Sequence, residues 1–306
     1  MEYPSEPCGA QGPMKPLRVR VRQTSQALGI PQEVVEKDYA LSYILAGVSS
    51  HPILKDTLVF KGGTALKKVF FGEYRFSEDL DFSGMGAPKG DELERCVAEA
   101  IELSRSLLLE QGLFSLLLER YQERDPHPHG QEAFIIRVQF PWHPGPLCRV
   151  KMEISHDEPI LLAPEKRPLL HGYYEENLRR EVTCYCLEEI IAEKLRTLLQ
   201  THEKLITRGW NRPRSRDYYD LWQILTKLGY AFKPEKVVEI LYLKNEHRNV
   251  SFSSPDDFFS QELVSEAYRN WDNSLSAFVM GLPGFDQVLE ELKPLVKTLL
   301  GEPYPG

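Results

Sequence analysis

The chain has 306 residues, of which 42% are hydrophobic, and its formal net charge is −8 at pH 7. This hydrophobic content is sufficient for the buried core of one large domain or two ordinary ones. No apolar run reaches the ~20 residues that a membrane span requires, and the negative charge excludes a general affinity for nucleic acid, so that a nucleic-acid partner needs a local basic patch.

The first residues, MEYPSEPCGAQGPMK, lack the basic start and apolar run of a signal peptide. We expect a flexible tail and N-terminal segment over residues 1–29, and a soluble, cytoplasmic protein with no membrane contact. The cysteines show no paired CxxC spacing, and their odd number argues against a complete disulfide framework. All five are predicted to be reduced thiols: Cys8, Cys96, Cys148, Cys184 and Cys186.

The next stretch alternates between helix and strand patterns. Pro31 suits a first helical position because its φ is fixed, and a helix is predicted from there to Val48. Periodicity and turn residues predict four elements after it: a strand at 58–62, a helix at 64–71, a strand at 77–83 and an amphipathic helix at 91–111.

Two further strands are predicted at 133–140 and 147–155, joined by a Pro- and Gly-rich turn, and helix patterns dominate after them. Strands alternating with helices imply a mixed sheet with helices packed on it. We therefore predict an α+β fold with a C-terminal α-helical domain. The expected parts are an N-terminal segment at 1–29, a sheet-bearing core at 30–186 and a helical domain at 187–306.

Asp79 and Asp81 stand two residues apart in a predicted strand. Side chains at this spacing point to the same face, while Leu80 and Phe82 point to the other face and can anchor the strand in the core. The two carboxylates then lie within roughly 7 Å of each other along the backbone. Mg²⁺ prefers such oxygen ligands together with substrate phosphates, and a pair of these ions can clamp the attacking and leaving oxygens of an in-line displacement.

Gly62, Gly63 and Thr64, which precede the aspartates, suit the phosphate end of a nucleotide. Glycine lets the backbone approach a phosphate closely, and the free N–H groups at the start of a helix form an anion site. Lys67 and Lys68 lie one turn further into that predicted helix. Together with the aspartates, this pattern fits a metal-bound triphosphate, whereas either fragment alone would be read as an ordinary turn or an exposed half-strand.

Two of these segments, FKGGTALKK and RFSEDLDFS, resemble the AbiEii/AbiGii nucleotidyltransferase toxin family, a branch of the DNA polymerase β-like nucleotidyltransferases that includes the MenT-type toxins. Further similar segments extend over most of the chain: VVEKDYALSYIL, RDYYDL, WDNSLSAFV and LPGFDQVLEEL. The resemblance implies a polymerase β-like mixed-sheet core and Mg²⁺-dependent transfer of a nucleotide from an NTP. For some members the acceptor is the 3′ end of tRNA, and the toxin role implies a cognate antitoxin.

Glu153 is a candidate for a third acid at the same site. It lies on the polar face of the strand predicted at 147–155, beside Lys151. From there it could complete the metal site or accept the proton of the attacking hydroxyl. A solvated glutamate next to Lys151 is an equal alternative.

Lys194 falls inside the apolar stripe of the helix that begins near residue 187, whereas Glu189, Glu193 and Arg196 lie on the opposite face. A buried ammonium is costly unless it is paired. Lys194 is therefore expected to meet an anion, either a triphosphate or a structural carboxylate. The family resemblance implies that this lysine is required for activity.

Asp217 lies in line with the apolar stripe of the helix predicted at 215–229, near its start. It could pair with Lys194, or it could simply favour the helix dipole. The resemblance implies that Asp217 is an active-site residue. Asp220, at the edge of the stripe, is predicted to cap the helix or to pair locally.

A basic tract joins those two helices without an acidic residue between its cations: Lys204, Arg208, Arg212, Arg214 and Arg216. Trp210 lies within it and could stack on a base. In a chain of net charge −8 this tract is the best candidate for contact with an RNA backbone, although a solvated loop is nearly as good an interpretation.

The combined hypothesis is an Mg²⁺-dependent nucleotidyltransferase toxin that uses an NTP, with tRNA as the expected acceptor. Asp79 and Asp81 would hold the metal and Lys194 would neutralise the triphosphate. Two alternatives remain: transfer to a protein or small-molecule hydroxyl, and a catalytically inactive module that binds RNA or an antitoxin.

Overall fold

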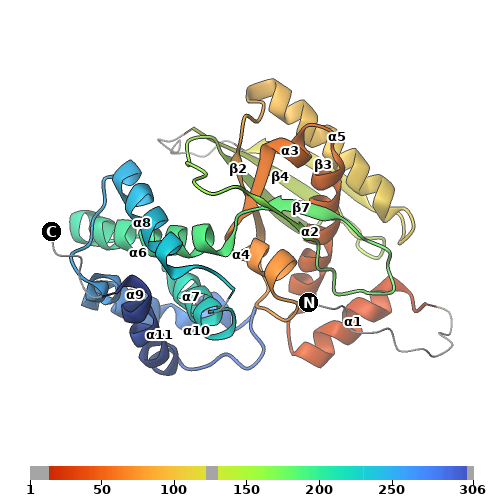
Figure 1. The fold of residues 1–306 in the computed structure, drawn as a ribbon. Helices are drawn as coiled ribbons and strands as arrows, with labels where there is room; N and C mark the ends of the chain where they lie inside the picture. Colours follow the sequence, from red (N-terminus) through yellow and green to blue (C-terminus); the bar gives the residue numbers. More distant parts are fainter. Residues whose placement is uncertain (1–13, 122–129, 230, 302–306) are drawn as a thin grey trace.

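The computed structural model describes residues 14–121, 130–229 and 231–301 (Figure 1). The expectations for residues 1–13, Cys8 included, lie outside these ranges. The other four cysteines are buried free thiols, in agreement with the prediction. Within the described residues, no helix is both long and apolar enough to cross a bilayer.

The strands of the described chain form one mixed sheet in the order β3-β4-β5-β2-β1-β7-β6. β2 runs parallel to β5 and β1 runs parallel to β7, while the other neighbours are antiparallel. The strands are β1 (Leu58–Lys61), β2 (Asp79–Gly84), β3 (Ser115–Tyr121), β4 (Gln131–Gln139), β5 (Cys148–Ser155), β6 (Glu165–Pro168) and β7 (Glu181–Cys184).

Helices before and between the strands cover the sheet, and together they make up the sheet lobe, residues 17–184. α2 is buried along most of its length and contacts β5, β7 and α5, because its apolar residues continue around the whole helix. The helical elements of this lobe are α1 (Leu17–Leu28), α2 (Gln32–Ser50), α3 (Leu54–Thr57), α4 (Gly62–Ala65), the π-helical turn η1 (Leu66–Phe70) and α5 (Gly90–Leu108).

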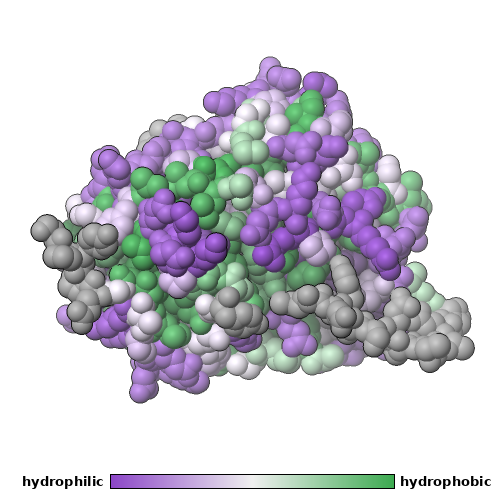
Figure 2. Space-filling model, in the orientation of Figure 1, coloured by the Kyte–Doolittle hydropathy of each residue, from purple (hydrophilic) through white to green (hydrophobic). Residues whose placement is uncertain are grey.

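The chain after β7 is helical and forms a second lobe, residues 187–300, beside the sheet (Figure 1). On the face shown in Figure 2, hydrophilic residues lie over both lobes, and apolar residues show over part of the helical lobe at the left. Its elements are α6 (Leu187–Arg208), α7 (Ser215–Lys227), α8 (Pro234–Arg248), the 3₁₀ turn η2 (Pro255–Phe259), α9 (Gln261–Arg269), α10 (Trp271–Leu275) and α11 (Phe285–Leu300).

This architecture confirms the predicted α+β fold with C-terminal helices. Two local differences have physical causes. The expected flexible segment at 1–29 contains α1, which forms because Leu17 and Val21 are buried. β3 was not predicted, since Leu117 on its outer face is 51% exposed and blurs the alternation of polar and apolar residues. We keep the division at residues 186 and 187 as a proposed domain boundary.

Candidate active site

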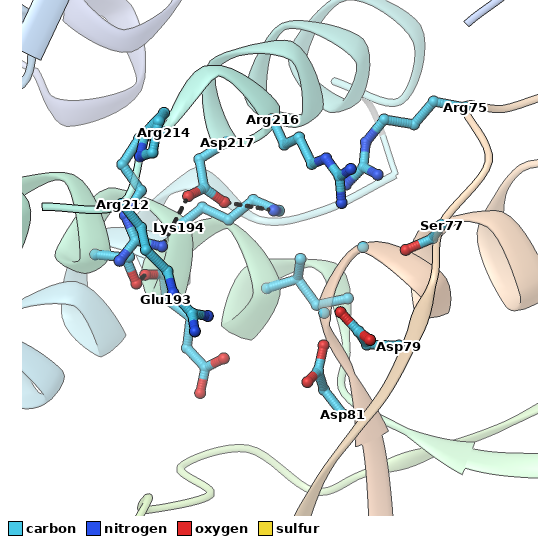
Figure 3. A pocket seen from close by; sticks show the side chains of 15 residues that line it. Arg75, Ser77, Asp79, Asp81, Glu193, Lys194, Arg212, Arg214, Arg216 and Asp217 are labelled. Carbon is cyan, nitrogen blue, oxygen red and sulfur yellow. Dashed lines mark hydrogen bonds and ion pairs between the residues drawn. The ribbon is translucent and has the colours of Figure 1, made fainter. Parts of the chain in front are cut away.

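Asp79 and Asp81 lie together at a cavity of about 320 Å³ between the two lobes (Figure 3). β2 positions them because Leu80 and Phe82, on its other face, are fully buried in the core. The prediction that the two carboxylates share one face of a strand is thus matched by the structure. The cavity is lined by Gly62, Gly63, Arg75, Ser77, Asp79, Asp81, Ile190, Glu193, Lys194, Thr197, Arg212, Pro213, Arg214, Arg216 and Asp217.

The two aspartates crowd negative charge at one wall of the cavity. Burial, reinforced by Glu153 and Asp79, raises the pKa of Asp81 to about 7. Burial also raises the pKa of Asp79, with Glu78 and Glu153 as further causes. Acidic groups held this way are suited to a hard divalent cation.

The donor set fits a metal that arrives with its substrate. Among the residues that the structure describes, no group of three or more His, Cys, Asp or Glu side chains could hold a metal ion. Mg²⁺ commonly uses one or two carboxylates and completes its shell with phosphate oxygens and water. Asp79 and Asp81 are therefore sufficient as protein ligands for that kind of ion.

Gly62 and Gly63 begin α4 directly beside the carboxylates. Gly62 has φ +78°, and a Cβ at this position would lie 2.5 Å from Oδ2 of Asp81. A Cβ at Gly63 would collide with the guanidinium of Arg75. Both glycines line the cavity. Because they have no side chain, the Asp81 carboxylate and the Arg75 guanidinium can lie directly against the backbone.

Thr64 is buried and braces the start of β2. Its hydroxyl donates to the carbonyl oxygen of Asp79 at 2.5 Å and lies 2.8 Å from the hydroxyl of Ser77. It does not line the cavity. We therefore assign Thr64 to positioning Asp79, in place of the direct phosphate contact expected from sequence.

Lys67 and Lys68 do not reach the cavity. Lys68 is buried, and its Nζ lies 2.8 Å from Oδ2 of Asp38 on α2. The Nζ of Lys67 lies 4.1 Å from the centre of the Phe76 ring. The phosphate role expected for these two lysines is corrected, because the turn that carries them points both ammonium groups at other partners.

Lys194 is on α6 and lines the cavity across from the aspartates of β2 (Figure 3). Its Nζ donates to Oδ1 of Asp217 at 2.9 Å and to Oδ2 of Asp220 at 2.7 Å. Burial lowers the pKa of the Lys194 ammonium, but the two carboxylates outweigh burial and raise that pKa above its ordinary value. The ammonium is thus held charged next to the cavity, and it meets structural carboxylates, one of the two kinds of anion expected from its place in the apolar stripe.

Asp220 differs from its predicted local role. It is fully buried and accepts from Arg75, which lies 145 residues earlier in the chain. The prediction of a cap or a local pair was wrong, because both α6 and the segment before β2 pack onto this face of α7. Sequence reasoning also missed Arg75 as a cavity residue.

Three arginines of the basic tract line the cavity: Arg212, Arg214 and Arg216 (Figure 3). Nε of Arg214 donates to Thr201 at 2.8 Å, and Nη2 of Arg216 donates to Glu78 at 3.0 Å. Trp210 is 70% exposed on the same loop. The tract therefore combines cavity cations with an exposed aromatic ring.

Two glutamates differ in their relation to the cavity. Glu153 lies opposite Asp81 in the pairing of β2 with β5, but its Oε1 accepts from Lys151 at 2.6 Å and from Gln131 at 2.7 Å. Glu193 lines the cavity and pairs with Lys61 at 3.3 Å. Sequence periodicity pointed Glu193 away from the core, and its partner comes from β1, so no local signal could identify it.

Comparisons with known proteins agree with this fold. Among curated proteins, no sequence matches the chain significantly. One similar solved structure is MenT4, a nucleotidyltransferase toxin from Mycobacterium tuberculosis H37Rv, with a TM-score of 0.62 and 20% sequence identity. The match covers 92% of this chain and 89% of MenT4, and at this identity it shows a shared fold.

The profile of one protein family matches residues 43–291, which is most of the chain and includes every cavity residue. Its description is "Nucleotidyl transferase AbiEii toxin, Type IV TA system". The chain belongs to this AbiEii family of nucleotidyltransferase toxins of type IV toxin-antitoxin systems.

Proposed function

We propose that the protein transfers a nucleotide from an NTP to the 3′ end of tRNA in an Mg²⁺-dependent reaction, and that a cognate antitoxin opposes it. One observation carries this proposal. A single cavity has two carboxylates, Asp79 and Asp81, on one wall and the cations Lys194, Arg212 and Arg214 among its other lining residues. A metal-bound triphosphate needs both kinds of group.

Mg²⁺ held by Asp79 and Asp81 would supply charge stabilisation at the attacking and leaving oxygens. The chain's own groups contribute positioning and electrostatics, as is usual in phosphoryl transfer. Lys194 and the nearby arginines offset the charge of the triphosphate. Asp217 holds the Lys194 ammonium at 2.9 Å and is available to orient the acceptor hydroxyl.

Glu153 acts through charge in this scheme. Its carboxylate accepts from Lys151 and Gln131, and it does not line the cavity. Its negative charge is among the causes that raise the pKa of Asp79 and Asp81. We therefore assign the metal to Asp79 and Asp81 alone among the acids of the sheet.

A polynucleotide acceptor is supported by the loop between α6 and α7. Burial and the positive charges of Arg214 and Arg208 lower the pKa of Lys204, which reflects a dense basic surface next to the cavity. Trp210 offers an exposed ring on which a base can stack. A basic groove with an aromatic ring is typical of proteins that bind single-stranded nucleic acid.

The direct test incubates the purified protein with Mg²⁺, total RNA and each of the four α-labelled NTPs in turn. The expected result is label on tRNA-sized RNA. Label on protein or on small hydroxyl compounds would assign a different acceptor, and tight RNA binding without any label would assign an inactive binding module. EDTA is expected to abolish transfer.

A pair of variants distinguishes loss of the metal site from a general effect of removing an aspartate. Asp79→Ala is expected to lose transfer while its circular dichroism spectrum stays that of the wild type. The matched control is Asp56→Ala, since this side chain is 57% exposed and pairs only loosely with Lys166 at 3.6 Å. Wild-type transfer by Asp79→Ala would refute the metal assignment.

The antitoxin part of the proposal is tested in cells. Expression of the wild-type chain is expected to arrest growth, and co-expression of the neighbouring gene product is expected to relieve the arrest. Asp79→Ala should be harmless in the same cells. Equal growth arrest by Asp79→Ala would separate toxicity from nucleotide transfer.

A further inference from the structure

Asp220 is fully buried on α7 and does not line the cavity, yet it contacts two cations that do. Its Oδ1 accepts from Nε of Arg75 at 2.6 Å, and its Oδ2 accepts from Nη2 of Arg75 at 2.7 Å. Its Oδ2 also accepts from Nζ of Lys194 at 2.7 Å. A substrate in the cavity would meet these cations and not the acid behind them.

Every hydrogen-bond acceptor site of the Asp220 carboxylate has a donor. Besides Arg75 and Lys194, the hydroxyl of Tyr74 donates to its Oδ1 at 2.6 Å. A carboxylate offers about four lone-pair sites, and four donors occupy them. The bidentate arrangement with Arg75 also fixes the plane of the guanidinium.

The two cations come from different lobes. Arg75 belongs to the segment between η1 and β2, whereas Lys194 is on α6. Two like charges that converge in a buried place repel each other unless an anion lies between them. Asp217 pairs with Lys194 at 2.9 Å and is partly exposed to the cavity, so Asp220 is the buried acid that Arg75 and Lys194 share.

We infer that Asp220 is a positioning residue, which fixes the Lys194 ammonium and the Arg75 guanidinium at the cavity wall and joins the two lobes there. This inference rests on the proposed function, because it assigns to those cations the binding of the NTP. The charged groups that act most strongly on Lys194 are Asp217 and Asp220 on α7 and Arg75 before β2. Without Asp220, Lys194 would keep only Asp217 as a partner, and Arg75 beside it would lose the carboxylate that offsets its charge.

The test compares NTP kinetics of the wild type and Asp220→Asn between pH 6 and pH 10. The variant is expected to raise the KM for NTP at least tenfold at pH 7. Its kcat/KM is also expected to decline toward pH 10, where that of the wild type stays level, because Lys194 loses its proton more easily beside one carboxylate than beside two.

Glu176→Gln is the matched control. Glu176 is also a buried carboxylate with several donors, among them Tyr39, Tyr43 and His171, and none of these residues lines the cavity. This control is expected to lose thermal stability while keeping the wild-type KM and alkaline limit. Identical kinetic changes in both variants would reduce Asp220 to a structural role and overturn the inference.

Two further measurements keep the inference testable. Asp220→Glu, which retains the charge, is expected to restore part of the affinity for NTP and most of the alkaline limit. If Asp220→Asn does not fold, pH-dependent acetylation of the wild type, read by mass spectrometry, takes its place. Lys194 should become reactive at a higher pH than exposed lysines of the same digest, and an equal or lower midpoint would overturn the inference.

Failure of the proposed function gives a different pattern. A wild-type protein that transfers no nucleotide to any acceptor would remove the enzyme assignment. The acetylation midpoint of Lys194 and the affinity for MgATP, each compared between wild type and Asp220→Asn, would still report on Asp220. Equal MgATP affinity of those two proteins would refute the positioning role by itself.

Discussion

Asp81 illustrates how a single residue at this site works against the stability of the fold. Its carboxylate is half-buried beside Asp79, and Asp81 lies opposite Glu153 on the next strand. Burial and these two acids raise its pKa to about 7, so the folded chain disfavours its charge. A group kept in such a place is typical of a functional site.

Asp81→Asn is therefore expected to raise the melting temperature in metal-free buffer while it lowers nucleotide transfer on the order of 10³-fold. The amide fills nearly the same space and carries no charge, so the repulsion among the acids falls. Thermal unfolding followed by circular dichroism, with EDTA present, measures the first effect. A lower melting temperature than that of the wild type would contradict the account of crowded charge.

Gly62→Ala tests the contact between the backbone and Asp81. Gly62 and Gly29 both have positive φ, but a Cβ at Gly29 would meet open space whereas one at Gly62 would meet the Asp81 carboxylate. Gly29→Ala is expected to cost ~1 kcal/mol of folding free energy and to leave transfer unchanged. Gly62→Ala should cost more and should also lower transfer, because the carboxylate must move.

At the scale of elements, α6 carries charged residues both to the cavity and to α8. Lys194 and Glu193 line the cavity. On α8, Lys244 is 0% exposed and pairs with Glu189 at 3.1 Å and with Glu193 at 3.3 Å. The helix thus connects the cavity wall to the interior of the helical lobe.

The loop between α6 and α7 makes a separate prediction about the acceptor. Trp210→Ala is expected to raise the KM for RNA by roughly 5- to 150-fold, because loss of one stacked base costs ~1–3 kcal/mol. The KM for NTP should not change. Tyr174→Ala is the matched control, since Tyr174 is 90% exposed and does not line the cavity. An unchanged RNA KM in Trp210→Ala would remove this loop from the acceptor site.

At the scale of the whole molecule, buried ion pairs join the two lobes. Glu158 follows β5 and is buried, and its Oε2 lies 2.6 Å from Nη2 of Arg248 on α8. Burial raises the pKa of Glu158, but Arg196, Lys61 and Lys244 outweigh burial and lower it to about 2. The ionised glutamate therefore stabilises the folded arrangement of the lobes.

Glu158→Gln is expected to lower the free energy of unfolding at pH 7 by about 3 kcal/mol, since it leaves buried cations without their anion. The sign of the pH dependence follows from the lowered pKa. The stabilisation by Glu158 is complete above the ordinary pKa of a glutamate and is lost as pH falls toward 2. Urea unfolding at pH 7 and pH 3 should show a smaller difference between variant and wild type at pH 3.

Much of the site could be predicted from the sequence, because the patterns that indicate it involve residues close together in the chain. Alternation along β2 places Asp79 and Asp81 on one face, and helical periodicity places Lys194 in an apolar stripe. The paired glycines Gly62 and Gly63 indicate that the backbone there lies close to other groups, which are Asp81 and Arg75 in the structure. Each of these signals depends on residues a few positions apart, which secondary structure alone brings together.

The sequence by itself thus determined β2, the helices around the site and the charged residues on their inner faces. Only the tertiary structure decided which partners those charges have. Lys68 faces Asp38, and Asp220 faces Arg75 and Lys194. Periodicity says that a side chain points inward but not what it meets. That depends on how elements distant in the chain pack, because a buried charge is stable only next to an opposite charge that the fold brings to it.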